Sequence, residues 1–255
     1  MTPTTIHLEG ANALVIGGGS GIGRAIALGL ARAGADVHVA GRRLQVLEST
    51  CTEVHDLGRR SLAFALDATR IDTLPGAVDA IEREVGLPDV LVNAQGVMAL
   101  GKAEDYTEAD YDRIMDTNLK SVWFACTAFG RRMLERGSGS IVNIASLASF
   151  RGFPGNGLYC MSKHGVRALT ETLAAEWAAR GVRVNAIAPG FFLTDLNRDA
   201  MSEERKARAL ARTPMRRFGE VDELAAAAVY LASPAASYVT GTTLPVDGGF
   251  LAMGM

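Results

Sequence analysis

Cysteine is scarce in this chain and histidine is scattered, and both facts exclude kinds of chemistry. The 255 residues include three cysteines, Cys51, Cys126 and Cys160, which are widely spaced and form no Cys-x-x-Cys pattern. An odd, dispersed set argues against a disulfide framework and against a zinc site. The histidines show no metal-ligand spacing either: they are His7, His38, His55 and His164. We therefore predict that no metal takes part in catalysis.

The chain also lacks an excess of charge and a long apolar run. Lysine and arginine number 26 and aspartate and glutamate 28, so the net charge is −2 at pH 7. Without a basic excess there is no reason to expect a nucleic-acid partner. Residues 1–10 lack the basic and apolar pattern of an export signal, and no apolar run reaches the ~18 residues of a membrane span. We expect a cytoplasmic protein with no membrane partner.

What the chain does have is a regular alternation of short β-branched runs and longer helical patterns. A helical stretch from about Ile22 to Ala33 ends at Gly34, and another begins at Thr107 and Glu108, where the threonine can cap it. Repeated βαβ units form a parallel sheet that is covered on both faces. The expected strands are residues 13–16, 36–40, 62–66, 90–93, 140–145, 182–188 and 242–246. We predict an α/β fold: one doubly wound, Rossmann-type parallel sheet of about seven strands with helices on both faces, in a single domain of residues 1–255.

A glycine-rich turn follows the first expected strand at residues 17–23, with the spacing Gly-x-x-x-Gly-x-Gly. Glycines let the backbone turn tightly and approach a pyrophosphate, and the following helix offers free N–H groups and its positive dipole end. The turn has no Gly-Lys-Ser/Thr ending, which argues against a triphosphate loop. We predict a dinucleotide-binding turn whose contact residues are Gly17, Gly19, Ser20, Gly21, Ile22 and Gly23.

Tyr159 and Lys163 lie four residues apart, and Ser146 lies thirteen residues before the tyrosine. On a helix, the first two side chains share one face, where the ammonium can stabilise a phenolate. A free tyrosine loses its proton near pH ~10, so acid/base work at neutral pH needs such help. We predict that Tyr159 is a general acid/base, that Lys163 lowers the pKa of its phenol, and that Ser146 hydrogen-bonds the substrate oxygen.

Over essentially its whole length the chain resembles the short-chain dehydrogenase/reductase family. The resemblance is carried by the turn at 17–23, by Asn93-Ala94-Gln95-Gly96, by Asn118, by Ser146 with Tyr159-x-x-x-Lys163, and by Val246-Asp247-Gly248-Gly249. It implies that Asn118 completes the catalytic set by ordering a water that leads from Lys163 to solvent. It implies further cofactor contacts, including the nicotinamide ribose for Lys163: Asp67, Ala68, Asn93, Gly96, Tyr159, Lys163, Pro189, Gly190 and Thr194. It also implies a homotetramer formed by the helices of Asn118 and Tyr159, with an apolar face from Leu169, Leu173 and Trp177.

Two positions depart from the family pattern. Ile16 stands where the family usually has threonine, and Ala94-Gln95 replaces Asn-Ala. Both positions concern packing and hydrogen bonds between the first and fourth strands. They therefore affect local details of the cofactor site and leave the expected reaction unchanged.

The choice between the two nicotinamide cofactors depends on the end of the second strand. A carboxylate there serves the ribose 2′-hydroxyl of NAD, whereas its absence together with an arginine suits the 2′-phosphate of NADP. Here Gly41 holds that position and Arg42 and Arg43 follow. We predict a preference for NADP(H) over NAD(H); the alternative is that both arginines are solvated residues at the start of the next helix.

The substrate is the least defined part of the prediction. Residues 191–215 are expected to form a mobile lid, and Phe153, Asn156, Phe191 and Phe192 are candidate walls of the pocket. The family resemblance implies hydride transfer between the cofactor and a secondary alcohol or ketone, such as a polyol or a sugar acid. Reduction of a 3-oxoacyl thioester is an alternative enzyme function. A dinucleotide sensor or scaffold without turnover is an alternative of another class.

Overall fold

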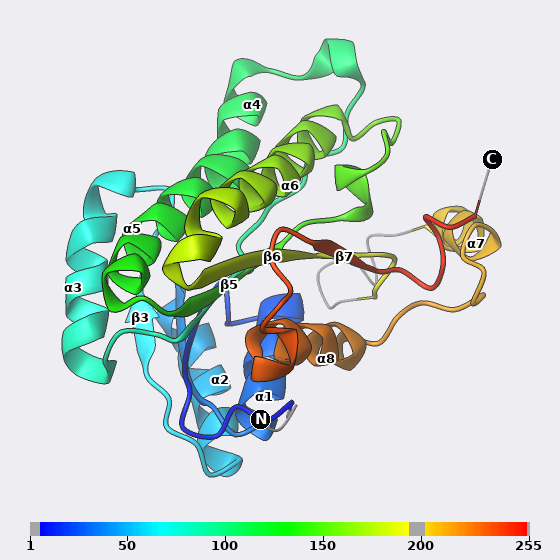
Figure 1. The fold of residues 1–255 in the computed structure, drawn as a ribbon. Coiled ribbons are helices and arrows are strands. Elements are labelled where there is room, and N and C mark those ends of the chain that lie inside the picture. Colours follow the sequence, from blue (N-terminus) through cyan, green and yellow to red (C-terminus); the bar gives the residue numbers. More distant parts are fainter. Residues whose placement is uncertain (1–5, 194–201, 254–255) are drawn as a thin grey trace.

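One sheet of seven parallel strands forms the centre of the computed structural model, which describes residues 6–193 and 202–253 (Figure 1). The strand order is β3-β2-β1-β4-β5-β6-β7. The strands are β1 (Asn12–Ile16), β2 (Asp36–Gly41), β3 (Ala63–Ala65), β4 (Val90–Asn93), β5 (Gly139–Ile144), β6 (Val182–Pro189) and β7 (Thr243–Val246). The predicted parallel sheet is confirmed, although β3 is shorter than residues 62–66 because only three of its residues pair with β2.

Helices cover both faces of the sheet. On one face lie α1 (Gly21–Arg32), α2 (Leu44–Asp56) and α8 (Val221–Ala232). On the other lie α3 (Leu74–Val85), α5 (Ser121–Arg136) and α6 (Gly157–Trp177). Two further helices, α4 (Glu108–Met115) and α7 (Glu203–Ala211), extend beyond the sheet (Figure 1). The predicted doubly wound arrangement is therefore confirmed.

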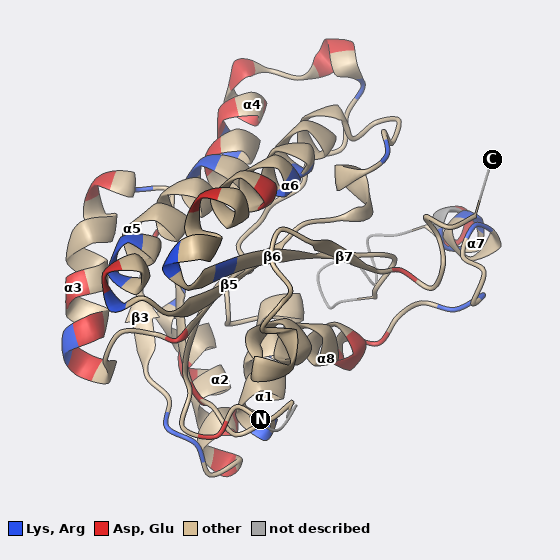
Figure 2. Ribbon diagram, viewed as in Figure 1, with Lys and Arg blue, Asp and Glu red and all other residues tan. Residues whose placement is uncertain are grey.

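The two cores follow from the alternation of side chains along the strands. In β1, Ala13 and Val15 belong to the core under α1, α2 and α8, whereas Leu14 and Ile16 belong to the core under α3, α5 and α6. Helices cover both faces, which explains why the strands are rich in apolar residues on both sides. Figure 2 shows charged residues on the outer helices and few on the strands. No helix in the described part of the chain is long and apolar enough to cross a membrane.

The helix boundaries agree with the capping signals in the sequence. The Thr107 side chain accepts a hydrogen bond from the backbone N–H of Asp110, and the Asp110 carboxylate accepts one from the N–H of Thr107, which is a capping box at the start of α4. Gly34 follows α1 with a φ of +107°, a conformation that residues with a Cβ rarely adopt. Both predicted helix ends are confirmed.

The apolar stripe of α6 that we assigned to subunit contacts faces the core instead. Leu169, Leu173 and Trp177 are 4%, 1% and 7% exposed. The indole of Trp177 lies against Gly130 of α5, so closely that a Cβ at Gly130 would come within 2.6 Å of the ring. The expectation that these three residues form an association surface is wrong, because all three are already buried in the core of the subunit.

Candidate active site

The predicted functional residues gather at the carboxyl ends of the parallel strands. The glycine-rich turn follows β1, Arg42 follows β2, Asp67 lies beyond β3, Gly96 lies beyond β4 and Ser146 lies beyond β5. In a parallel sheet the carboxyl ends of all strands lie on the same side of the sheet, and ligands of doubly wound folds bind there. The sheet therefore brings together residues that are far apart in the sequence.

The glycine-rich turn fits a pyrophosphate. Gly17 has a φ of +83°, and a Cβ at Gly23 would lie 2.2 Å from the carbonyl oxygen of Gly17, so the first turn of α1 packs directly on the loop. Ser20 is the N-cap residue of α1, but its side chain makes no capping hydrogen bond. The first N–H groups of the helix thus have no side-chain acceptor, which is the geometry that binds an anion.

The end of β2 presents positive charge without a paired acid. Arg42 and Arg43 are exposed, and neither guanidinium has a hydrogen bond or ion pair among the residues that the structure describes. The carboxylate of Asp67 accepts hydrogen bonds from the Thr69 hydroxyl at 2.7 Å and the Thr69 N–H at 3.1 Å. These bonds, with a smaller contribution from Arg42, lower the pKa of Asp67. Asp67 is therefore an ionised acceptor at this edge.

Asn93 is the last residue of β4, where the motif predicts it. Its side-chain amide is 1% exposed and donates to Asn143 Oδ1 at 2.9 Å and to the Cys126 sulfur at 3.2 Å. Asn143 in turn donates to Thr170 Oγ1 at 3.0 Å. These bonds join β4, β5 and α6 inside the core. The Asn93 side chain therefore ties the end of β4 to the core, and its predicted contact with the cofactor stays a prediction.

The departures at Ile16 and Ala94-Gln95 leave the junction of β1 and β4 intact. The backbone N–H of Ala94 donates to the carbonyl oxygen of Ile16 at 2.9 Å. Ile16 itself is 1% exposed and packs in the apolar core. The Gln95 side chain donates to the hydroxyl of Ser121, at the start of α5, at 3.1 Å. Main-chain bonding holds the two strands together here, so a threonine hydroxyl is not required.

The structure brings the four predicted catalytic residues together. Lys163 Nζ lies 5.7 Å from the centroid of the Tyr159 ring and donates to the carbonyl oxygen of Ile144 at 2.7 Å. Ser146 begins a short 3-10 turn just after β5, and its hydroxyl accepts a hydrogen bond from the N–H of Ala148 at 3.1 Å. Because Tyr159 and Lys163 share the first turns of α6, the phenol and the ammonium lie beside the end of β5.

Asn118 occupies a π-helical turn, Asp116–Lys120, between α4 and α5. Its side chain is fully buried, accepts from the N–H of Val97 at 2.7 Å and donates to the carbonyl oxygen of Val97 at 2.8 Å and to Ser162 Oγ at 3.1 Å. The side chain therefore ties the loop after β4 to α6. A water-ordering role would have to use the backbone, which a π-helical turn displaces from the regular hydrogen-bond pattern.

Burial dominates the electrostatics of the tyrosine and the lysine. Burial raises the pKa of Tyr159, and a hydrogen bond with the Ser146 side chain acts in the opposite direction. Burial lowers the pKa of Lys163 to about 8. The expectation that Lys163 holds the pKa of the phenol below its usual value is therefore wrong for the protein without cofactor. Tyr159 is a protonated acid at neutral pH in this state.

Of the candidate substrate residues, three are half-buried and one lies in the core. Phe153 and Phe191 are half-buried, and the half-buried Asn156 donates to the sulfur of Met98 at 3.6 Å. Phe192 is 6% exposed and packs in the core against Gly219, so its assignment as a pocket wall is wrong. Sequence reasoning missed Phe250, whose ring contacts both Phe153 and Phe191.

The expected lid, residues 191–215, is described at 191–193 and 202–215, where it includes α7. Thr194 lies outside the described residues. Gly190, at the start of this segment, donates its N–H to the carbonyl oxygen of Val246 at 2.9 Å, so β6 and β7 remain paired up to the point where the segment leaves the sheet.

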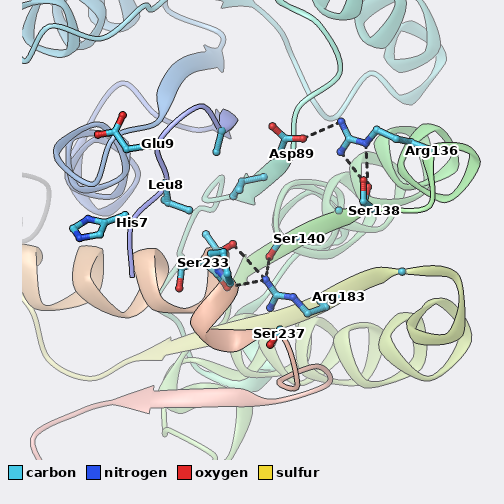
Figure 3. A pocket seen from close by; sticks show the side chains of 16 residues that line it. His7, Leu8, Glu9, Asp89, Arg136, Ser138, Ser140, Arg183, Ser233 and Ser237 are labelled. Carbon is cyan, nitrogen blue, oxygen red and sulfur yellow. Dashed lines mark hydrogen bonds and ion pairs between the residues drawn. The ribbon is translucent and has the colours of Figure 1, made fainter. Parts of the chain in front are cut away.

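A cavity of about 320 Å³ lies at the opposite edge of the sheet, by the amino ends of β4, β5 and β6 (Figure 3). Its arginines already have partners: Arg183 donates to the carbonyl oxygen of Leu231 at 2.8 Å and to Ser140 Oγ at 3.1 Å, and Arg136 pairs with Asp89 at 3.1 Å. These contacts fasten α8 and α5 to the sheet. The cavity is thus a consequence of packing and lies apart from the predicted catalytic residues.

Among the described residues, no three histidine, cysteine, aspartate or glutamate side chains lie together as metal ligands. The cysteines are all buried and unpaired with one another. Burial raises the pKa of the Cys126 thiol to about 12, which makes it a poor nucleophile.

Known proteins match this chain over nearly its whole length. A family model described as enoyl-(acyl carrier protein) reductase matches residues 17–251. Gluconate 5-dehydrogenase of Gluconobacter oxydans is 39% identical over 97% of each chain, and D-threitol dehydrogenase of Mycolicibacterium smegmatis is 40% identical over 96% of this chain and 94% of the relative. The crystal structure of a gluconate 5-dehydrogenase from Burkholderia cenocepacia, in complex with NADP and tartrate, superposes with a TM-score of 0.94 at 35% identity over 98% of each chain. The chain belongs to the short-chain dehydrogenase/reductase family of oxidoreductases.

Proposed function

We propose that this protein interconverts a secondary alcohol and a ketone with NADP(H), and that Tyr159 is the general acid/base. The observation that carries the proposal is the grouping of Tyr159, Lys163 and Ser146 beside the end of β5. When bound, the nicotinamide supplies or accepts the hydride. Tyr159 donates its proton to the carbonyl oxygen of the substrate during reduction, and its phenolate takes the hydroxyl proton during oxidation.

The other residues prepare this proton transfer. Ser146 hydrogen-bonds the same substrate oxygen and so orients the carbonyl towards Tyr159. Lys163, cationic below about pH 8, attracts the phenolate left by proton donation and holds the nicotinamide ribose. Asn118 keeps the loop of Val97 and the helix of Ser162 in register, which fixes the space above Lys163. Each role places a polar group at the reacting oxygen or beside it.

Cofactor preference for NADP(H) is supported by the charges at the end of β2. Arg42 is exposed and forms no ion pair in the described part of the chain, and Gly41 provides no acid to repel a phosphate. A 2′-phosphate would meet a guanidinium that can donate two hydrogen bonds. The relative from Burkholderia cenocepacia, whose structure contains NADP, is compatible with this preference.

For the substrate, we propose a polyol, a sugar acid or a related hydroxy or oxo compound. Relatives that act on gluconate and D-threitol support this class. A 3-oxoacyl thioester is the second candidate, favoured by a relative, the 3-oxoacyl-[acyl-carrier-protein] reductase of Staphylococcus epidermidis, which is 38% identical over 93% of this chain. An acidic carrier protein would be attracted by a basic surface, but the net charge of −2 offers no excess of cations. The presence of all four catalytic groups argues against a sensor or scaffold without turnover.

We also propose that the protein forms a homotetramer through α5 and α6. Trp123 and Phe124 on α5 are each 38% exposed, and Met161 on α6 is 53% exposed. Burying such side chains between subunits removes apolar surface from water. Light scattering during size exclusion should give four chains per particle, and Trp123→Glu should reduce that mass, whereas Tyr238→Glu, at a fully exposed position on neither helix, should not.

The experiment that tests the proposed activity is a survey of carbonyl compounds and alcohols. NADPH or NADP, and separately NADH or NAD, would be supplied with ketoses, oxo sugar acids, polyols and a 3-oxoacyl thioester while absorbance of the reduced cofactor is followed. We expect turnover with a polyol or sugar-acid pair and lower specificity constants with NAD(H). Failure of every compound, together with normal cofactor binding, would contradict the proposal and favour a sensor.

A further inference from the structure

Three phenylalanines from distant parts of the sequence meet beside the proposed active site. The ring of Phe250 stacks on that of Phe153, with centroids 6.2 Å apart and an angle of 28° between the planes. It also meets the ring of Phe191 edge to face, at 5.4 Å and 73°. Both arrangements are favourable for aromatic pairs. Phe250 therefore connects two rings that have no direct contact of their own among the described aromatic pairs.

The positions of the three segments place this aromatic cluster, Phe153, Phe191 and Phe250, at the substrate side of the site. Phe153 lies on the loop between Ser146 and Tyr159, and Phe191 directly follows Pro189-Gly190 at the carboxyl end of β6. All three rings are half-buried. Each ring thus keeps part of its surface open to a ligand, unlike a ring of the core.

The turn that carries Phe250 is fixed in place by hydrogen bonds. The Asp247 carboxylate accepts from the N–H of Gly249 and from the N–H of Leu251, both at 2.9 Å. Gly190 packs so tightly on this turn that a Cβ there would lie 2.6 Å from Asp247 Cα. On the other side, the N–H of Met215 donates to the carbonyl oxygen of Gly248 at 3.1 Å. The C-terminal turn therefore joins both described ends of the segment 191–215.

We infer that Phe250 determines substrate specificity, by holding Phe153 and Phe191 as one apolar wall for the part of the substrate that does not react. The inference rests on the proposed function and names what the site accepts: a carbonyl compound whose remaining carbon chain lies with its C–H groups against the three rings. Because the wall is anchored by the C-terminal turn, it limits the bulk of that chain. Removal of the Phe250 ring opens the wall and relaxes the limit.

The specificity experiment compares wild type, Phe250→Ala and Phe250→Leu with the control Tyr238→Ala, which removes an aromatic ring at a fully exposed position. Each of these proteins would be tested with NADPH on two series of substrates: ketoses of increasing chain length, and methyl ketones from butanone to phenyl methyl ketone. A pocket distinguishes substrates by about 10- to 200-fold per methylene-sized change. The ratio compared is the specificity constant for bulky substrates divided by that for compact substrates. Phe250→Ala should raise this ratio by about 10-fold or more, and Phe250→Leu should raise it by less.

An unchanged ratio in Phe250→Ala and Phe250→Leu, with all substrates slowed equally, would overturn the inference. The dissociation constant for NADPH, from fluorescence titration, should change less than about twofold, since the rings lie on the substrate side. A large loss of NADPH affinity in both variants would show that Phe250 supports the cofactor site, which also overturns the inference.

Hydrogen exchange provides a readout that does not need turnover. Amides at 151–157 and 187–193 should exchange faster in Phe250→Ala than in wild type, because the ring that links these segments is gone, and Tyr238→Ala should match wild type. Equal exchange in all three proteins would show that Phe250 holds nothing in place. If wild type turned over no compound, the proposed function would fail, and this exchange result alone would then decide whether Phe250 forms the wall.

Discussion

The ammonium of Lys163 donates a hydrogen bond to the carbonyl oxygen of Ile144 across 2.7 Å, which joins α6 to the last residue of β5. Lys163 is 3% exposed, and Ser146 lies two residues beyond Ile144. The bond sets the position of the lysine relative to both Ser146 and Tyr159. Burial of the same ammonium lowers its pKa to about 8, so its charge is lost close to physiological pH.

The first prediction concerns the pH dependence of ketone reduction. Lys163 carries its charge below about pH 8 and is neutral above it, so kcat/KM should fall as the pH rises through that value. Tyr159, whose pKa is raised by burial, remains protonated over the same range and cannot cause the fall. Rates would be measured from pH 6 to 10 at limiting substrate. A flat profile to pH 10, or the same fall in Lys163→Arg, whose guanidinium stays charged, would contradict the assignment.

The second prediction concerns the proton donor. Tyr159→Phe removes one hydroxyl and keeps the ring, so NADPH binding should stay nearly unchanged while kcat falls by at least ~10²- to 10⁴-fold, the contribution of a positioned acid/base. The control is Tyr106→Phe, which removes a hydroxyl that hydrogen-bonds the carbonyl oxygen of Ala99 at 3.0 Å. Steady-state rates of Tyr159→Phe within tenfold of wild type would show that another group supplies the proton.

The strands and the shared helix face of Tyr159 and Lys163 could be predicted because they depend on local spacing. Apolar runs identify the strands, and the four-residue separation of Tyr159 and Lys163 places both on one side of α6. What buries Trp177 could not be predicted, since an apolar stripe on a helix looks the same in the sequence whether α5 or another subunit covers it. Asn93 is similar: its motif marks the edge of the sheet, but its partner Asn143 belongs to another strand.

Phe250 escaped prediction because its contacts are with residues that lie far from it in the sequence. Nothing near Val246-Asp247-Gly248-Gly249 indicates that the next ring meets Phe153 and Phe191. The pKa of Tyr159 escaped for another reason. Helical spacing brings the lysine near the phenol, whereas the burial that raises the pKa of Tyr159 is set by packing around the whole site.

The third prediction concerns acid stability. His38 is 2% exposed, and its Nδ1 accepts a hydrogen bond from the N–H of Leu62 at 3.0 Å. Burial lowers its pKa from 6.5 to about 4, with a smaller effect of Arg60 in the same direction and of Asp36 in the opposite one. As the pH falls from 6.5 to 4, the histidine is protonated in the unfolded chain before it is protonated in the folded one. The free energy of unfolding should therefore decrease by on the order of 3 kcal/mol.

The matched variant for this prediction is His38→Asn, whose side-chain oxygen can still accept from Leu62 but does not titrate. Urea unfolding at pH 7, 5.5 and 4.5 should show a smaller loss of unfolding free energy in His38→Asn than in wild type. The exposed His7, changed to asparagine, should behave as wild type does. Equal losses in all three proteins would assign the acid sensitivity to other groups.

The fourth prediction concerns Ile16, the departure at the end of β1. Ile16→Thr loses a buried methylene-sized volume and buries a hydroxyl in an apolar core, which together cost on the order of 1–4 kcal/mol. At about 2–4 °C per kcal/mol for a chain of this size, the melting temperature should fall by several degrees. Ile16→Val, which removes one methyl group and adds no hydroxyl, should fall less. A raised melting temperature for Ile16→Thr would mean that the hydroxyl finds a partner near Ala94 or Gln95.

The last prediction tests the cofactor preference at the end of β2. Arg42→Ala removes a guanidinium that only NADP(H) can use through its 2′-phosphate, so the specificity constant for NADP(H) should fall while that for NAD(H) changes little. A hydrogen bond to a charged group contributes ~1.5–3 kcal/mol, so the preference should drop roughly 10- to 150-fold.

Gly41→Asp adds a carboxylate that repels the phosphate and accepts from the ribose hydroxyls of NAD(H). The position has room for it, because a Cβ at Gly41 would meet its nearest neighbour, Leu47, at an ordinary 3.6 Å. The double change Gly41→Asp with Arg42→Ala should therefore prefer NAD(H). Arg70→Ala, which removes an exposed arginine paired with Asp72, is the control for a general loss of positive charge. A wild type that already favours NAD(H), or an Arg42→Ala that lowers both cofactors equally, would identify Arg42 as a solvated residue before α2.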